Sequence, residues 1–427
     1  MSLPRQRFAA TLVMLLVFAW AGLAALTGLA RAQASVAGTL APSTWVALRP
    51  VPHQGRSAIF ALAVDPLNNQ VVVAGTADGT LIRSADGGST WKQVHGGSAG
   101  LLTIGFSPFK AGLLLAGTRG TGALASRDAG LTWAAVKGTE ARSVRVFGFA
   151  LTRFVAGTDQ GVYASVDGIT WKQSGLANVS IAALAVTAVH DPARMVAGSD
   201  SSTGIGGVPL FQSTDGGTSW SPIGASISGK VVACLAAGPL PPPPSTVRPL
   251  VVGTNAGLFT SRDNGTSFIP NSGGGGLPST DYTQIAFVTS HYERYYAASD
   301  GGGSASGGLW RTSNAGRSFA SMAPPLPSVT ALAVSNDEAP TLYVATFRPS
   351  DQMAVLWAYH DTGGPPQGSP ATVTPSTSGS RITPPLAGGS GLSQFLLSSR
   401  MPYIAVGLAA LIVIGLAVVT HFRSRRG

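Results

Sequence analysis

Short apolar runs, four to a unit, repeat along most of this chain. In the first unit, turn residues of the Gly, Asp and Asn types separate apolar runs at residues 59–64, 71–75, 80–83 and 91–94. Runs of this length that are rich in β-branched and aromatic residues are typical of strands. Because no segment between about residues 45 and 360 has a helical period, the pattern predicts an all-β fold.

A polar turn motif, Ser-x-Asp-x-Gly-x-Thr-Trp, lies between the third and fourth predicted strands of these units. Two copies are complete, one is a residue shorter, and others match the motif less closely. Their motif residues are Ser84, Asp86, Gly88, Thr90, Trp91, Ser126, Asp128, Gly130, Thr132, Trp133, Ser165, Asp167, Thr170, Trp171, Ser213, Asp215, Gly217, Trp220, Ser261, Asp263, Gly265 and Phe268. A weaker copy ends at Phe319, and the aromatic positions follow one another at intervals of 38 to 51 residues. One turn motif in each unit of this length is typical of a propeller or solenoid.

The two ends of the repeat array complement each other, and counting the units gives seven. A degenerate copy at Tyr359, Asp361 and Gly363 has no aromatic strand after it, whereas residues 43–48 look like the tail of a copy with its fourth strand. We therefore expect the N-terminal strand to complete the last blade, which closes the ring and removes the free sheet edges. The sequence predicts a seven-bladed β-propeller over residues 43–364, formed as a monomeric ring.

The turn motif resembles the Asp-box, or BNR, repeat of sialidases, sortilin-type receptors and the photosystem II assembly-factor propellers. The resemblance covers about residues 43–364 and implies that the boxes lie on the face opposite the usual ligand site. Turn chemistry explains the motif residues, because an Asp carboxylate accepts hydrogen bonds from turn N–H groups and Gly permits a left-handed tip. We therefore interpret the box residues as structural rather than catalytic or calcium-binding.

A sialidase-like glycoside hydrolase is the enzymatic alternative that this resemblance suggests. Its chemistry needs an arginine cluster, a Tyr nucleophile activated by Glu and an acidic proton donor. The family's Phe/Tyr-Arg-Ile-Pro signature is absent, and no Tyr partner can be assigned to Glu140, Glu293 or Glu338. The six histidines are scattered without metal-ligand spacing. We predict no catalytic residue, no metal and no cofactor, while a hydrolase that uses Asp alone stays open.

The segments on either side of the propeller have the composition of membrane-targeting sequences. Residues 1–34 predict a signal peptide, with cleavage favoured by a small-x-small pattern and an uncleaved anchor as the alternative. Residues 365–400 are a Pro/Gly/Ser/Thr-rich linker, 401–421 form an apolar transmembrane helix, and 422–427 are a basic tail that is expected in the cytoplasm. The chain is thus predicted to be a single-pass membrane protein with its propeller outside the cytoplasm.

The formal net charge of +10 by itself suggests a nucleic acid or an acidic partner. The positions of the charged residues along the chain change this interpretation. Eight of the 28 Lys and Arg residues lie outside residues 43–364, which leaves 20 basic against 18 acidic residues in the propeller. No Lys/Arg stripe with interleaved aromatic residues is present, so no nucleic-acid partner is predicted. The single cysteine, Cys234, lies in an apolar run and is predicted to be a buried small hydrophobe.

The repeats are unequal on the face opposite the boxes. Long second-to-third-strand loops at residues 199–208, 299–308 and 347–353, with the connection at 270–281, extend the rim of blades four to seven. The candidate partner residues on this rim are Asp200, Asp281, Asp300, Arg348 and Asp351. Arg119, on the side with tight turns, is a further candidate. Tolerated length variation is the alternative explanation. Because function concentrates in loops on a rigid ring, we expect a non-catalytic protein- or glycan-binding scaffold. The resemblance to the photosystem II assembly-factor propellers suggests a role in assembling or stabilising a membrane complex. A cell-surface sialidase-like glycoside hydrolase or glycan-binding protein is the alternative.

Overall fold

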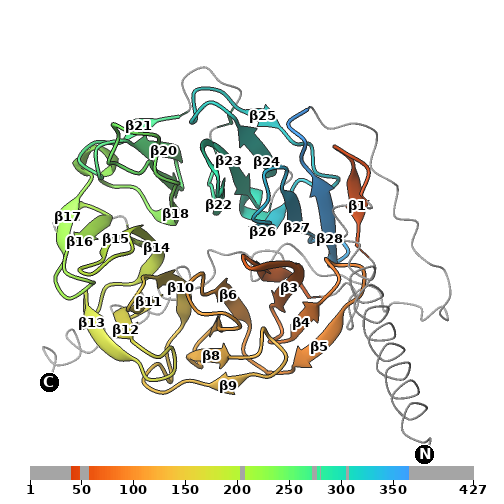
Figure 1. The fold of residues 1–427 in the computed structure, drawn as a ribbon, viewed down its shortest axis with the longest axis horizontal. Helices are drawn as coiled ribbons and strands as arrows, with labels where there is room; N and C mark the ends of the chain where they lie inside the picture. The colour runs from red at the N-terminus through yellow and green to blue at the C-terminus, as the bar shows by residue number, and fades with distance from the viewer. Residues whose placement is uncertain are drawn as a thin grey trace, which may run out of the picture.

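The computed structural model describes residues 40–48, 57–201, 207–271, 277–278, 280–303 and 307–364. Within these residues, seven four-stranded antiparallel sheets stand as blades around a common centre (Figure 1). The helical segments in the same residues are the short 3-10 turns η2 (Ala225–Ile227) and η3 (Gly301–Gly303). The prediction of an all-β propeller with seven blades is confirmed.

The strands follow the chain from the inside of each blade to the outside, except in the last blade. Blade 1 contains β2 Ile59–Asp65, β3 Asn68–Thr76, β4 Leu81–Ser84 and β5 Lys92–His95. Blade 2 contains β6 Leu101–Phe106, β7 Leu114–Thr118, β8 Ala123–Ser126 and β9 Ala134–Ala135. Blade 3 contains β10 Val144–Phe149, β11 Phe154–Thr158, β12 Gly161–Ser165 and β13 Lys172–Gly175.

Blades 4 to 7 repeat the same order. Blade 4 contains β14 Ile181–Ala188, β15 Arg194–Ser199, β16 Leu210–Ser213 and β17 Ser221–Ile223. Blade 5 contains β18 Val232–Ala237, β19 Leu250–Thr254, β20 Gly257–Ser261 and β21 Ile269–Pro270. Blade 6 contains β22 Gln284–Val288, β23 His291–Ser299, β24 Gly308–Thr312 and β25 Ala320–Ser321, and blade 7 contains β26 Val329–Val334, β27 Thr341–Arg348, β28 Met353–His360 and β1 Trp45–Ala47.

Burial follows the position of a strand within its blade. Every residue of the second strands β7 and β11 is buried, because neighbouring blades cover both faces of these strands. The fourth strands β5 and β9 lie at the periphery in Figure 1 and carry exposed residues. The apolar middle and polar edge of each repeat unit therefore reflect distance from the centre of the ring.

In blades 1 to 5, a glycine near the end of the second strand lies against the next blade. A Cβ atom at Gly117 would lie 2.2 Å from the carbonyl oxygen of Val144, on the first strand of the next blade. At Gly157 the same atom would lie 2.7 Å from Cγ2 of Ile181, again on the next blade. Since real Cβ atoms do not approach backbone oxygen so closely, these positions require glycine for the blades to pack.

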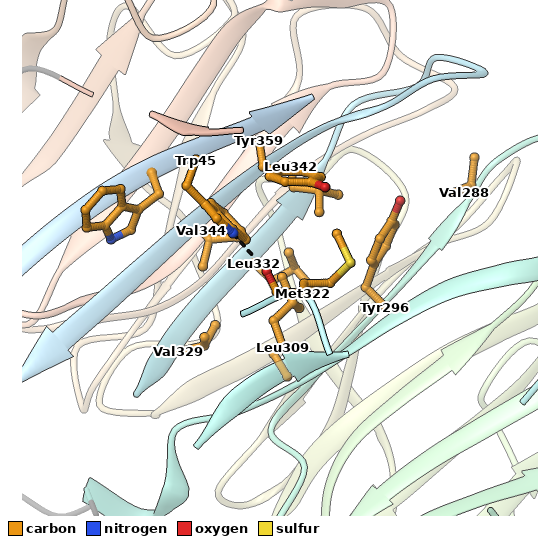
Figure 2. Packing of buried hydrophobic residues seen from close by; sticks show 12 residues of the cluster. Trp45, Val288, Tyr296, Leu309, Met322, Val329, Leu332, Leu342, Val344 and Tyr359 are labelled. Atoms are coloured by element: carbon orange, nitrogen blue, oxygen red, sulfur yellow. Dashed lines mark hydrogen bonds between the residues drawn. The ribbon is translucent and has the colours of Figure 1, made fainter. Parts of the chain in front are cut away.

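The N-terminal strand closes the ring. Strand β1 pairs with β28 in antiparallel register, with Trp45 opposite Tyr359, and their ring centroids are 4.8 Å apart. The indole Nε1 of Trp45 donates a hydrogen bond of 2.9 Å to the carbonyl oxygen of Met322, which precedes blade 7 (Figure 2). The predicted completion of the last blade by the N-terminal strand is confirmed.

The membrane-targeting segments predicted from the sequence, at residues 1–34, 365–400, 401–421 and 422–427, lie outside the described residues. In the part of the chain that the structure does describe, no helix combines the length and apolar character needed to cross a bilayer.

Candidate partner-binding face

Antiparallel blades give the ring two faces with different connections. The first-to-second-strand connections and the repeated turn motifs leave the strands at one end, here called the hairpin face. The second-to-third-strand loops and the blade-to-blade connections leave at the other end, here called the loop face. The predicted box residues therefore lie on the hairpin face, and the predicted partner residues lie on the loop face.

The turn motifs of the hairpin face share one hydrogen-bond pattern. In blade 1, the Ser84 hydroxyl donates to Oδ1 of Asp86 at 2.8 Å and accepts from the backbone N–H of Gly88 at 2.7 Å. The Thr90 N–H donates to Asp86 Oδ1 at 2.8 Å, and Nε1 of Trp91 donates to the Gly88 carbonyl oxygen at 3.0 Å. The contacts from Ser and to the motif Asp recur in blades 2 to 5. Each hairpin thus uses its carboxylate to order its own turn.

These hydrogen bonds favour the ionised carboxylates. The N–H groups of Thr170 and Ile169 lower the pKa of Asp167 to about 2. Burial raises the pKa of Asp128, but hydrogen bonds from Thr132 and Ser126 outweigh it and lower that pKa to about 2 as well. In blade 6, Asn314 replaces the aspartate and still accepts from the Ser318 N–H at 2.9 Å.

The loop face has a repeated backbone frame that carries different side chains. In six blades, a Thr or Ser lies near the end of the second strand, and the residue after it donates its backbone N–H. The acceptor is the carbonyl oxygen of the residue that immediately precedes the first strand of the same blade, at 2.8 to 3.4 Å. The donors are Ala77, Arg119, Asp159, Asp200, Asn255 and Phe347. These equivalent positions present apolar, basic, acidic and amide side chains from a fixed main chain.

Sequence reasoning found only part of this ring of positions. It selected Arg119 and Asp200 by charge and loop length, but it missed Asn255 and Phe347. Aligning the repeats on the small residue and the Thr or Ser near the end of the second strand would have revealed the equivalence, because the next residue is the shared donor. This pair is Gly-Thr before Asn255 and Ala-Thr before Phe347.

Asp200 lies deeper than a rim residue should. It is buried, with 7% of its surface exposed, and it forms an ion pair with Arg145 of the neighbouring blade 3. The hydroxyl of Ser180 also donates to Asp200 Oδ2 at 3.1 Å. Arg145 lies where strand β10 bulges between Val144 and Val146, a feature that the sequence does not indicate. Asp200 therefore joins blades 3 and 4 at the loop face.

The other predicted partner residues fall into separate groups. Asp281 Oδ1 accepts from the hydroxyls of Thr280 at 3.1 Å and Ser299 at 3.4 Å, and Asp300 Oδ1 accepts from the Gly302 N–H at 2.9 Å. The structure therefore brings Asp281 next to the blade 6 loop that contains Asp300.

Arg348 and Asp351 form an exposed pair within one blade 7 loop, with nitrogen–oxygen distances of 2.9 and 2.6 Å. The pair lowers the pKa of Asp351 and raises that of Arg348. Arg119 is exposed on blade 2, so the two basic candidate residues lie on blades 2 and 7, with blade 1 between them.

A buried ionic cluster lies at the hairpin end of blades 6 and 7, where the sequence predicted only a degenerate turn motif. Asp361 is fully buried, and its carboxylate lies 2.6 Å from Nη1 of Arg311 and 2.9 Å from Nη2 of Arg294. The Tyr296 hydroxyl donates to Asp361 Oδ2 at 2.5 Å. Burial raises the pKa of Asp361, but Tyr296 and Arg294 outweigh it and the net shift is downward. In the sequence, the feature that could have indicated this cluster is the presence of two arginines, Arg294 and Arg311, within the apolar strands of blade 6.

Two further expectations concern reactive groups. Cys234 is partly rather than fully buried, and its Sγ–H donates to the carbonyl oxygen of Tyr282 at 3.2 Å. Burial raises the pKa of this thiol, which disfavours the reactive thiolate. Across the described residues, no group of three or more His, Cys, Asp and Glu side chains is arranged to hold a metal ion.

No protein-family model and no curated protein matches this chain. Among solved structures, the chain is similar to YCF48 from Cyanidioschyzon merolae, with 14% identity, a TM-score of 0.50, and coverage of 74% of this chain and 98% of that one. YCF48 bound to a D1 peptide gives the same identity and TM-score, over 74% of this chain and 96% of that one. The GH74 xyloglucanase from Xanthomonas campestris gives 14% identity and a TM-score of 0.55, over 74% of this chain and 56% of that one. The shared property is the β-propeller fold. These neighbours include both a peptide-bound protein and an enzyme, so the likeness by itself assigns no activity.

Proposed function

We propose that this chain is an Asp-box propeller that binds a protein segment on its loop face, catalyses no reaction, and is tethered outside the cytoplasm by an apolar C-terminal helix. The observation that carries the proposal is the backbone frame of the loop face. In six blades one N–H fixes the loop, while the residue that carries it is Ala, Arg, Asp, Asn or Phe, depending on the blade. A fixed main chain with varied side chains is the arrangement that recognition surfaces use.

The residues on this frame favour a polar peptide as the ligand. Arg119 and Asn255 are exposed on blades 2 and 5, and partly buried Phe347 adds an apolar side chain on blade 7. An extended segment across the loop face would meet donors, acceptors and an aromatic ring from different blades. Because the main chain of each loop is already hydrogen-bonded, binding would order few groups, which limits its entropic cost.

The solved neighbours support a peptide ligand at the level of the fold. One of them is YCF48 bound to a D1 peptide, so a ring of this kind can hold a peptide. A glycosidase needs one carboxyl group that donates a proton. The exposed Asp351 is a poor donor, since the guanidinium of Arg348 lowers its pKa. We therefore prefer protein binding over the glycan-cleaving alternative.

The proposed tether rests on the sequence beyond the described propeller. Residues 401–420 are apolar and uncharged, and Arg423, Arg425 and Arg426 follow them. Twenty apolar residues in a helix would span a hydrocarbon core of about 30 Å. Basic residues after such a segment favour a cytoplasmic C-terminus, which would leave the propeller on the other side.

Photocrosslinking in the native membrane tests the binding proposal. A photoreactive amino acid would replace Arg119 or Phe347 in the full-length chain, and Lys172 on the outer strand β13 would serve as the matched control position. We expect one protein to be crosslinked from the loop-face positions and not from Lys172. Equal crosslinking from all three positions would contradict the proposal. Turnover of xyloglucan or sialyl oligosaccharides by the purified chain would instead establish the hydrolase alternative.

A further inference from the structure

The exposed large apolar side chains of the propeller are concentrated on one face. Across the described residues there are seven of them, with 40 to 76% of their surface exposed. Six lie in connections of the hairpin face, and the seventh, Ile269, lies on the outer strand β21. Five belong to blades 1 to 3, and we call them the apolar arc: Leu67, Phe109, Leu131, Leu151 and Val166.

Hydrogen bonds and packing join three of the loops that carry the apolar arc, those of Phe109, Leu131 and Val166. The Ala129 N–H donates to the Gly112 carbonyl oxygen at 3.0 Å, which links the two blade 2 loops that carry Leu131 and Phe109. Nε of Arg83 donates to the Ala129 carbonyl oxygen at 2.6 Å, which links blade 1 to blade 2.

The hairpin of Val166 packs on blade 2 in the same way. A Cβ at Gly168, in this hairpin, would lie 3.5 Å from Cδ2 of Leu113, which immediately precedes the second strand of blade 2. Together these contacts hold the loops of Phe109, Leu131 and Val166 side by side on the hairpin face of blades 2 and 3.

Equivalent positions in other blades are polar, so the repeat itself does not require the apolar residues. In the motif of blade 4, Thr214 occupies the position of Val166 and Thr218 the position of Leu131. Both threonines are exposed. Single exposed apolar residues are ordinary on a protein surface, but several on adjacent turn tips of one face indicate a contact surface.

The described chain also begins and ends on the hairpin face. The Ser43 N–H donates to the His360 carbonyl oxygen at 3.0 Å, so the start of β1 lies beside the end of β28. Gly364, the last described residue, accepts from Nη1 of Arg311 at 3.1 Å at the same end of blade 7. From Leu40 and Gly364, the sequence leads to the apolar runs at residues 8–30 and 401–420. Blade 7 adjoins blade 1, where the apolar arc begins (Figure 1).

We infer that the hairpin face of blades 1 to 3 rests on the lipid surface of the membrane that holds the tether. This inference rests on the proposed membrane tether. The apolar arc enters the interface between headgroups and acyl chains, and the exposed Lys110 and Arg127 next to it contact lipid phosphates. The motif carboxylates on this face are already hydrogen-bonded within their hairpins. The loop face then points away from the membrane, toward the proposed partner.

Fluorescence quenching by lipids tests the inference. The full-length chain with Cys234→Ala would be reconstituted in nanodiscs of phosphatidylcholine and phosphatidylglycerol, with a single cysteine at Leu151 or Val166 that carries an environment-sensitive dye. Matched control labels would stand at Thr214, the equivalent of Val166 in blade 4, and at Asn255 on the loop face. With brominated lipids, we expect quenching at Leu151 and Val166 to exceed that at Asn255 at least threefold, with Thr214 intermediate or low. Quenching at Leu151 and Val166 no greater than at Asn255 would overturn the inference.

A second readout separates this inference from the tether. If alkaline extraction removes the chain from the membrane, the tether proposal fails and the surface contact fails with it. If the chain is retained but the arc labels are not quenched, only the surface contact fails. As a further check, Phe109→Ser with Leu131→Ser should lower quenching at Val166 without lowering the melting temperature, because both side chains are exposed. Unchanged quenching in this double variant would also count against insertion of the arc.

Discussion

Arg311 and Asp361 form an ion pair of 2.6 Å that connects the third strand of blade 6 to the turn after β28, the third strand of blade 7. Arg311 also donates to the carbonyl oxygens of Gly363 and Gly364, at 2.9 and 3.1 Å. The same turn meets the N-terminal residues, where the Ser43 hydroxyl lies 3.3 Å from that of Thr362. This buried cluster therefore sits at the point where the two ends of the propeller are held together.

Removing the charge of Asp361 should destabilise the ring. The variant Asp361→Asn would leave Arg294 and Arg311 without their carboxylate in a buried site, and losing one partner of a buried ion pair typically costs about 3–5 kcal/mol. Thermal unfolding of the full-length chain in detergent measures the effect. The matched control is Asp351→Asn, which breaks an exposed pair with Arg348 and should destabilise the protein far less, because solvent screens that pair. If both variants lose a similar amount of stability, burial of the Asp361 ion pair does not determine its contribution to stability.

The stability of the propeller should fall in acid because of the same carboxylate. The pKa of Asp361 is lower in the folded chain than its unfolded value of about 3.9, so its ionised form stabilises the fold above that pH. That contribution is lost as the pH falls below about 4 and through the folded pKa. The melting temperatures of wild type and Asp361→Asn, compared between pH 7 and pH 2, should therefore converge at the acidic end. A constant difference across this range would contradict the explanation.

The turn motifs should tolerate an amide in place of the carboxylate but not an alanine. In blade 6, Asn314 accepts from the Ser318 N–H at 2.9 Å and donates from Nδ2 to the Ser318 hydroxyl at 2.7 Å. We expect Asp128→Asn to change the unfolding free energy by less than about 0.5 kcal/mol, whereas Asp128→Ala should cost about 1–2 kcal/mol through lost hydrogen bonds. Chemical denaturation of the three proteins provides the comparison. If the Asn variant is as unstable as the Ala variant, the negative charge itself has a further role.

Trp45 should contribute more to stability than its counterpart in blade 2. Trp45 is 4% exposed, its ring packs against that of Tyr359 at a tilt, and its indole donates across the blade boundary to Met322. Trp45→Ala should therefore cost about 3–5 kcal/mol and make the protein prone to self-association through an open sheet edge. Trp133 occupies the equivalent place in blade 2 but is only partly buried, so Trp133→Ala should cost less. Melting temperature and gel filtration measure the two effects, and equal losses would contradict a special role for ring closure.

The sequence by itself determined the all-β fold, the number of blades and the closure of the ring. Those properties follow from local signals: apolar runs of strand length, one turn motif in each unit, and a motif split between residues 43–48 and 359–363. Each signal lies within a few residues of chain, because a hairpin is specified by its own turn and flanking strands.

Tertiary structure alone decided which polar residues pair and which turn tips share a surface. Arg145 and Asp200 are 55 residues apart, and Arg311 and Asp361 are 50 apart, so their contacts depend on the packing of neighbouring blades. The bulge in β10 and the fully buried position of Asp361 are likewise products of that packing. Leu67 and Val166 come from different blades, and they share one face because antiparallel strands send their alternate connections to the same end of the ring.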